Sequence, residues 1–349
     1  MKGATTLRKV SLGLLVVAII GLAALPMIQR YSTDGGFVTN SMLFNFTQMF
    51  MLIIVASSWN LTGGFTGYVD FGHGVWFGIG AYGTGVLMSK LGWPFPLAVA
   101  GAIAITVLAA LLIGGPILRL RGPYFSIAML ATFVAVREII RIVKPITGGG
   151  IGLTLPPYLN RPLFFYIMLI LAVLVVAFTW WLRRTQFGLT LIAIREDEIG
   201  ADMRGINTTL HKITIFGLSA AITGLVGALW AYQNTFIDPD IVFVESRTMD
   251  VIIAVILGGL GTVAGPVIGA VVLFWARDII WANFLQFHLI VQGVVLIAIV
   301  LWVPEGIIGT FSDRSGGTTL GRLMSRRRGK STSNDVVDSP EDEPRTVSS

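Results

Sequence analysis

The chain alternates between long apolar stretches and short polar connections. Ten apolar stretches reach or approach the roughly 20 residues that an α-helix needs to cross the core of a bilayer. They predict helices at residues 10–28, 38–59, 75–89, 97–118, 124–143, 163–182, 212–232, 248–257, 266–281 and 289–303. The pattern therefore predicts an all-α, polytopic integral membrane protein with about 8–10 transmembrane helices.

Composition agrees with this fold class, because 54% of the 349 residues are hydrophobic and only 13% are charged. Soluble domains contain roughly 25% charged residues. The net charge of +6 comes from clusters between helices and in the tail. Since no basic stripe is interleaved with aromatic residues, we expect no nucleic-acid binding.

Lysine and arginine concentrate in alternate connections, which predicts that both termini are cytoplasmic. The cytoplasmic clusters are Lys2, Arg8 and Lys9, then Arg119 and Arg121, then Arg183, Arg184, Arg195, Arg204 and Lys212, and finally the basic residues of 314–330. The stretch 10–28 is long for a secretory signal, so we expect a retained first helix, with a cleaved signal as the alternative. A transmembrane domain over 1–311 is expected to precede a disordered cytoplasmic tail over 312–349.

The sequence lacks the residues that several kinds of catalytic, metal and nucleotide site require. The chain has no cysteine and no G-x-x-x-x-G-K-[ST] loop, and its three histidines lie far apart. We therefore expect no catalytic residue, no metal site and no cofactor on this chain.

Two glycine-rich breaks adjoin the two shortest apolar stretches. They read "GGFTGYVDFGHG" and "GGLGTVAGP", and they form a weak internal repeat of the kind found in transporters with paired broken helices. The predicted break and pathway residues are Gly63, Gly64, Gly67, Asp70, His73, Gly74, Gly78, Gly258, Gly259, Gly261 and Gly265. We expect the two breaks to flank one translocation pathway, and small residues spaced by four to allow close helix packing.

Polar residues in three places are candidates for a function, and the first two places have two interpretations each. Asp70 and His73 either face a pathway or are solvated near the interface. The segment 194–212 is charged but carries Ile199, Met203, Ile206 and Leu210 at helical spacing, which predicts an amphipathic helix that docks on a partner rather than a solvated loop. Arg137, Glu138 and Arg141 predict an interfacial anchor with a Glu138–Arg141 pair.

Three stretches together resemble one family. They are "GYVDFGHGVWFGIGAYG" at 67–83, "AIREDEIGADMRGINTTLHKITIFGLSAAITGLVGALWA" at 193–231, and "VILGGLGTVAGPVIGA" at 255–270. They resemble the permease subunits of branched-chain amino acid ABC importers of the LivM type, over about 38–309. The chain departs from the family pattern at Glu305 and Ile151.

The resemblance implies a coupling segment at about 194–211, in which Glu198, Ala201, Gly205, Ile206 and Asn207 match the family's pattern. It implies a multi-pass subunit of the cytoplasmic (inner) membrane that is not itself an enzyme. The implied partners are a homologous second permease, two ATPase subunits that bind ATP, an extracytoplasmic substrate-binding protein and the lipid bilayer.

Three alternatives stay open. One is a urea or short-amide permease of the same superfamily. Another is a proton-coupled secondary transporter that uses Asp70 and His73 as proton carriers. The last is a structural or assembly protein of the membrane, which the paired glycine breaks argue against.

Overall fold

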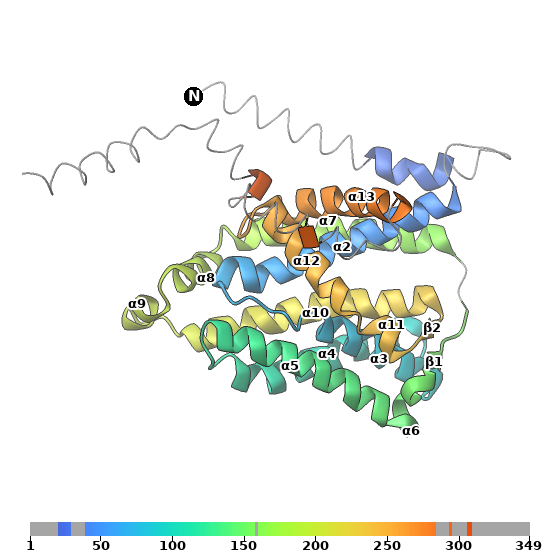
Figure 1. The fold of residues 1–349 in the computed structure, drawn as a ribbon, viewed down its shortest axis with the longest axis horizontal. Helices are drawn as coiled ribbons and strands as arrows, with labels where there is room; N and C mark the ends of the chain where they lie inside the picture. Colours follow the sequence, from blue (N-terminus) through green and yellow to red (C-terminus); the bar gives the residue numbers. More distant parts are fainter. Residues whose placement is uncertain (1–19, 29–38, 158–159, 284–292, 295–305, 309–349) are drawn as a thin grey trace, which may run out of the picture. The chain divides into compact units, whose positions relative to one another are not determined.

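The described part of the chain is almost entirely helical (Figure 1). The computed structural model describes residues 20–28, 39–157, 160–283, 293–294 and 306–308, all of which belong to one unit, residues 1–308. Residues 20–28 are helical, and the elements that follow are α2 (Asn40–Thr66), α3 (Gly74–Ser89), α4 (Phe95–Ile117), α5 (Pro123–Ile142), α6 (Lys144–Thr147), η1 (Gly149–Ile151), β1 (Leu153–Thr154), α7 (Arg161–Leu182), α8 (Gln186–Glu196), α9 (Glu198–Met203), α10 (Thr208–Asn234), β2 (Phe236–Ile237), α11 (Pro239–Val242), α12 (Glu245–Gly258) and α13 (Gly265–Asn283).

Within the described residues, four helices are long and apolar enough to cross a membrane, namely α2, α4, α7 and α10. Helices α3 and α12 are shorter, with 16 and 14 residues, as the sequence predicts. The predicted helix at 289–303 lies outside the described residues except for 293–294, and 312–349 and most of 10–28 lie outside them too. The orientation of the termini, the helix count and the domain boundary at 311 therefore stay predictions.

Helix α10 lies at the centre of the bundle and packs on α2, α3 and α4. Glycines bring its backbone close to α3, since a Cβ at Gly80 would overlap the backbone of Gly224, and a Cβ at Gly227 would overlap the backbone of Phe77. Small residues permit such contacts between helices in a membrane. The prediction that small residues allow close helix packing is confirmed at these contacts of α10.

After α10 the chain forms a short strand and a short helix before α12 begins. Residue Thr235 ends α10 in a left-handed conformation, and β2 then pairs with β1 in an antiparallel register of Leu153 with Ile237. Asp238 caps α11 by accepting hydrogen bonds from Asp240 and Ile241, and α12 follows. This two-residue strand pair is the departure from the all-α prediction within the described chain.

Candidate functional site

The first helix break runs from Gly67 to His73, between α2 and α3. Helix α2 ends at Thr66 and is capped by Gly67, whose backbone is left-handed with φ 76°, a conformation that glycine adopts without steric cost. The helix continues through Gly63 and Gly64, so the prediction that the break begins there is wrong. A glycine lowers helix stability by only about 1 kcal/mol, and at Gly64 the absent side chain admits the backbone of Gly261.

Asp70 and His73 lie in this break, and their side chains are buried, with 0% and 1% exposure. The Nδ1 atom of His73 lies 3.2 Å from Oδ2 of Asp70, and the backbone N–H of Gly72 donates to the other carboxylate oxygen. This burial excludes the solvated interpretation of the pair. A place on the pathway stays a prediction.

A chain of hydrogen bonds joins the break to α2 and α10. The Nε2 atom of His73 lies 2.8 Å from the hydroxyl of Thr223, which lies 3.0 Å from that of Ser58. The hydroxyl of Ser58 donates to the carbonyl of Ser219 at 2.7 Å. Because all of these groups are buried, each depends on the others for a hydrogen-bond partner.

The second break separates α12, which ends at Gly258, from α13, which begins at Gly265. The side-chain amide of Asn60 on α2, which is 0% exposed, forms hydrogen bonds to two residues of this break. Its Nδ2 donates to the carbonyl of Thr262 at 2.8 Å, and its Oδ1 accepts from the N–H of Gly261 at 2.9 Å. The second break therefore packs directly against the last turns of α2, which lead into the first break.

The segment 194–212 contains the end of α8, all of α9 and the start of α10 instead of one helix. Gly205, which is left-handed with φ 82°, lies between α9, which carries Ile199 and Met203, and α10, which carries Leu210. The prediction of one short amphipathic helix that carries all four apolar residues is therefore wrong. The apolar side chains nonetheless lie at the surface: Ile199 is 56% exposed, Met203 83% and Leu210 59%. Ile206 is half-buried. An exposed apolar patch of this kind is typical of a protein contact.

Two further coupling-segment residues have local structural roles. Ala201 is buried, with 3% exposure. Asn207 caps α10, because its side-chain oxygen accepts a 2.9 Å hydrogen bond from the N–H of Leu210. Both hold the exposed turn in place.

Glu198, the first residue of α9, points into the protein. The hydroxyl of Tyr68 donates to its Oε2 at 2.6 Å, and the ammonium of Lys212 donates to its Oε1 at 2.8 Å. Lys212 also donates to the carbonyl of Leu118 at 3.1 Å, and the guanidinium of Arg121 lies 3.7 Å from the carboxylate. This cluster connects the coupling segment to the first break.

The electrostatics of the cluster favour a charged Glu198. Burial alone would raise the pKa of this carboxyl, but hydrogen bonds from Lys212 and Tyr68, together with the charges of Lys212 and Arg121, outweigh burial and lower the pKa below its ordinary value. The carboxylate therefore stays ionised and paired at neutral pH.

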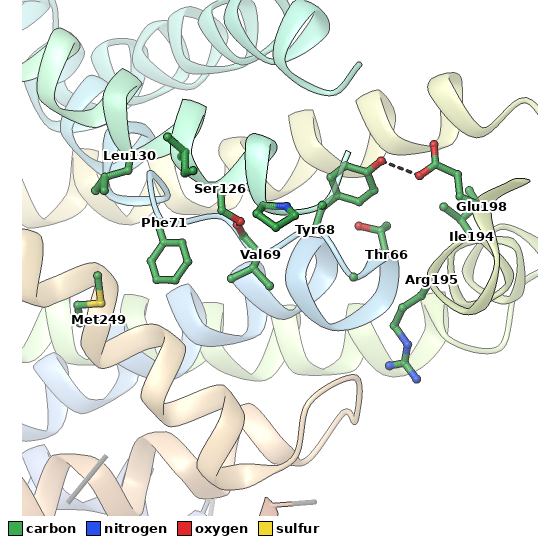
Figure 2. A pocket seen from close by; sticks show the side chains of 14 residues that line it. Thr66, Tyr68, Val69, Phe71, Ser126, Leu130, Ile194, Arg195, Glu198 and Met249 are labelled. Atoms are coloured by element: carbon green, nitrogen blue, oxygen red, sulfur yellow. Dashed lines mark hydrogen bonds between the residues drawn. The ribbon is translucent and has the colours of Figure 1, made fainter. Parts of the chain in front are cut away.

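A cavity of 880 Å³ opens beside the first break. Figure 2 shows Tyr68, Val69 and Phe71 of the break beside Ser126 and Leu130 of α5. The cavity is also lined by Met249 of α12 and by Ile194, Arg195 and Glu198 at the α8–α9 junction. Non-helical backbone at membrane depth is tolerated where it is buried in protein or lines water, so an aqueous cavity here is consistent with the break.

Only some of the break and pathway residues that the sequence predicts lie at this cavity. Gly67 lines it, whereas Gly258, Gly259, Gly261 and Gly265 of the second break do not. The backbone N–H of Gly74 instead donates a 3.2 Å hydrogen bond to the hydroxyl of Thr248, and Gly78 lies against the ring of Phe243.

Four residues of the site were missed from the sequence: Tyr68, Lys212, Asn60 and Arg195. The guanidinium of Arg195 donates to the carbonyl of Gly64 at 2.9 Å. Lys212 and Asn60 stand at the edges of apolar stretches, where a polar side chain needs a partner. That position was the available signal, but the sequence does not tell which residue is the partner.

Comparison with known proteins identifies relatives over most of the chain. The family described as "Branched-chain amino acid transport system / permease component" matches residues 41–300. No solved structure matches.

The curated relatives are permease proteins of transport systems. The chain is 28% identical to the high-affinity branched-chain amino acid transport system permease protein LivM of Salmonella typhimurium, over 88% of this chain and 76% of the relative. It is 29% identical to LivM of Escherichia coli, over 84% of this chain and 74% of the relative. It is 26% identical to the autoinducer 2 import system permease protein LsrC of Salmonella typhimurium, over 74% of this chain and 77% of the relative.

Proposed function

The chain belongs to the branched-chain amino acid transport system permease family, and we propose that it moves branched-chain or other hydrophobic amino acids across the cytoplasmic membrane. It is a multi-pass permease component of an ABC-type transporter, and its relatives are transport subunits rather than enzymes. An amino-acid substrate is favoured over autoinducer 2 because the match to the LivM proteins covers 84–88% of the chain, against 74% for LsrC.

The proposed transporter contains three kinds of partner subunit for this chain. A second, homologous permease completes the pathway, two ATPase subunits bind and hydrolyse ATP, and a substrate-binding protein delivers the amino acid from the other side of the membrane. In this arrangement the end of the bundle that bears α8 and α9 is cytoplasmic.

One observation carries the proposal: the exposed α9 turn is tied to the first break by the bonds of Glu198 to Tyr68 and Lys212. An ATPase subunit that seats Ile199 and Met203 in a groove moves α9 as a unit, because six residues make less than two helical turns. The hydrogen bonds of Glu198 then transmit this movement to Tyr68, which lines the cavity. ATP hydrolysis thereby biases the pathway between two open states.

The test is a pair of matched substitutions at the surface. Met203→Ser changes a side chain that is 83% exposed on α9, and Ile151→Ser changes one that is 84% exposed on η1. We expect both variants to insert normally, Met203→Ser to lose most ATPase copurification and ATP-driven uptake of L-leucine, and Ile151→Ser to retain ATPase binding.

Two results would contradict the proposal. One is full ATPase copurification and uptake with Met203→Ser. The other is accumulation of L-leucine by the chain alone in vesicles with a proton gradient and no ATPase, which would favour the secondary transporter.

A further inference from the structure

One face of helix α7 is exposed and carries only apolar and aromatic side chains. The exposed residues in the second half of the helix recur at helical spacing and form a single stripe. They are Ile170, Val173, Leu174, Ala177, Trp180 and Trp181. Because α7 is long and apolar enough to cross a membrane, a stripe without polar side chains is a surface that suits lipid chains.

Arginines mark both ends of α7 and set its depth in a bilayer. Arg161 begins the helix and Arg183 follows its last residue, and residues 162–182 contain no Asp, Glu, Lys or Arg. At 1.5 Å per residue this uncharged stretch is about 31 Å long, which matches the roughly 30 Å hydrocarbon core. The two tryptophans therefore lie at one edge of the core, where tryptophan is enriched, and the charges that follow them lie at the level of phospholipid headgroups.

The turn between α7 and α8, residues 183–185, is held by local bonds. The hydroxyl of Thr185 donates to the carbonyl of Leu182 at 2.7 Å and accepts from the N–H of Gly188 at 3.1 Å. A Cβ at Gly188 would overlap the carbonyl of Leu182. Leu182 itself belongs to a buried apolar cluster that includes side chains of α2 and α10. The α7–α8 turn therefore has a defined position against the bundle.

This turn presents two positive charges. Arg183 and Arg184 are both exposed, and neither has an acidic partner within the described part of the chain. Arg195, at the other end of α8, differs because it lies 2.8 Å from Glu196. Unbalanced cations at headgroup level attract anionic lipids. The sequence pattern used these two arginines only to orient the helices.

Arg184 is also held in a geometry that suits a phosphate group. The central carbon of its guanidinium lies 3.8 Å from the centre of the Trp180 ring. The N–H donors of a guanidinium lie in its plane, so stacking on an indole leaves them free at the edge of the group. That edge matches two phosphate oxygens with two parallel hydrogen bonds.

We propose that Arg183 and Arg184 bind the phosphate of an anionic phospholipid, while Trp180 and Trp181 contact the first part of its acyl chains. The apolar stripe of α7 continues along the path of those chains. An acidic protein segment would match the arginines but would leave the indoles, which are 47% and 56% exposed, without an apolar partner. A phospholipid supplies both an anion and apolar chains, and tryptophan fits such a boundary.

The bound lipid would hold the turn from which α8 leads to α9. This inference goes beyond the proposed function, because it does not depend on the transported substrate or on the ATPase. It assigns a lipid site to one corner of the bundle rather than a general attraction to the membrane surface.

The experiment uses the full-length chain, purified in detergent with the subunits that copurify with it. Native mass spectrometry measures the dissociation constants of phosphatidylglycerol and phosphatidylcholine with the same acyl chains. The variants are Arg184→Gln, Arg184→Lys and the control Arg119→Gln. Arg119 is also exposed and contacts no aromatic ring among the described residues. It lies at the same end of the bundle, since the carbonyl of Leu118 before it accepts from Lys212.

We expect the wild type to bind phosphatidylglycerol at least fivefold more tightly than phosphatidylcholine. Arg184→Gln should weaken phosphatidylglycerol binding at least fivefold, and Arg184→Lys at least twofold because it keeps the charge but loses the planar, stacked fork. Arg119→Gln should change it less than twofold, and excess inorganic phosphate should not displace the lipid.

Four results would overturn the inference. The first, which needs no variant to fold, is equal affinity of the wild type for the two lipids. The second is the same loss in Arg119→Gln as in Arg184→Gln, which would show diffuse attraction only. Displacement by inorganic phosphate would show a simple anion site. Unchanged lipid binding by Arg184→Gln together with lost ATPase copurification would assign the arginines to a protein contact.

Discussion

Tyr68 and Glu198 are 130 residues apart in the sequence, yet the phenol hydroxyl donates a 2.6 Å hydrogen bond to the carboxylate. One residue belongs to the first helix break and the other begins α9. Lys212 reaches the same carboxylate from α10, so three elements meet at one ion pair. Movement of α9 relative to the break must either carry Tyr68 along or disrupt these bonds.

Glu198→Gln should uncouple the transporter and destabilise it. The substitution leaves the ammonium of Lys212, which is 4% exposed, without its counter-ion. Removing one partner of a buried ion pair costs about 3–5 kcal/mol, and we expect the lower end because Glu198 is 17% exposed. Thermal unfolding of the purified complex and ATP-driven uptake measure the two effects.

The double variant Glu198→Gln/Lys212→Met is the matched comparison. It removes both charges, so most of the lost stability should return while coupling stays impaired. Asp202→Asn, an exposed position of α9, controls for stability. Equal stability of the wild type and Glu198→Gln would show that the pair contributes nothing.

The ion pair also predicts a pH dependence. The pKa of Glu198 is lowered in the folded protein from an ordinary value of 4.5, so its contribution to stability is complete above about pH 4.5 and is lost as pH falls through the folded pKa. The stability difference between the wild type and Glu198→Gln should be constant from about pH 6 to 8 and shrink below about pH 4.5. A difference that changes between pH 6 and 8 would assign the effect to another group.

The long apolar helices could be predicted from the sequence because their length and composition suffice. Helix α7, for example, ends at Leu182 as predicted. The second break was located correctly because Gly258 and Gly265 bound it. The first break was placed too early, since Gly63 and Gly64 stay helical where neighbouring backbone fills the space of their side chains.

The candidate site was harder to predict because its bonds join distant parts of the chain. Asn60 binds Gly261, 201 residues away, and no local pattern encodes that pairing. The arginines of α5 show the same limit, since Arg137 has an acidic partner on α12 and Arg141 has one on α11. The sequence identified the correct polar residues and gave them a local explanation.

Gly80→Ala should be strongly destabilising, because the added Cβ would overlap the backbone of Gly224 on α10. Because the overlap is with backbone rather than with the end of a flexible side chain, we expect the free energy of unfolding to fall by about 1–3 kcal/mol, as for other overpacked sites. Gly115→Ala on α4 is the control, with open space at the same position. It should stabilise the protein by about 0.5–1 kcal/mol. Melting temperatures of the two variants in the same detergent compare them, and similar values would refute the close contact.

Thr223→Val should cost about 1–3 kcal/mol, because it keeps the side-chain shape but removes the hydroxyl 2.8 Å from Nε2 of His73. The buried imidazole and the hydroxyl of Ser58 would each lose a hydrogen-bond partner. Thr214→Val on the same helix is the control, since that exposed hydroxyl donates only to the carbonyl of Leu210, and a change within about 0.5 kcal/mol is expected. If Thr223→Val is as stable as Thr214→Val, the hydrogen bonds from the break to α10 do not stabilise the fold, and Asp70 and His73 must be held by α2 and the break alone.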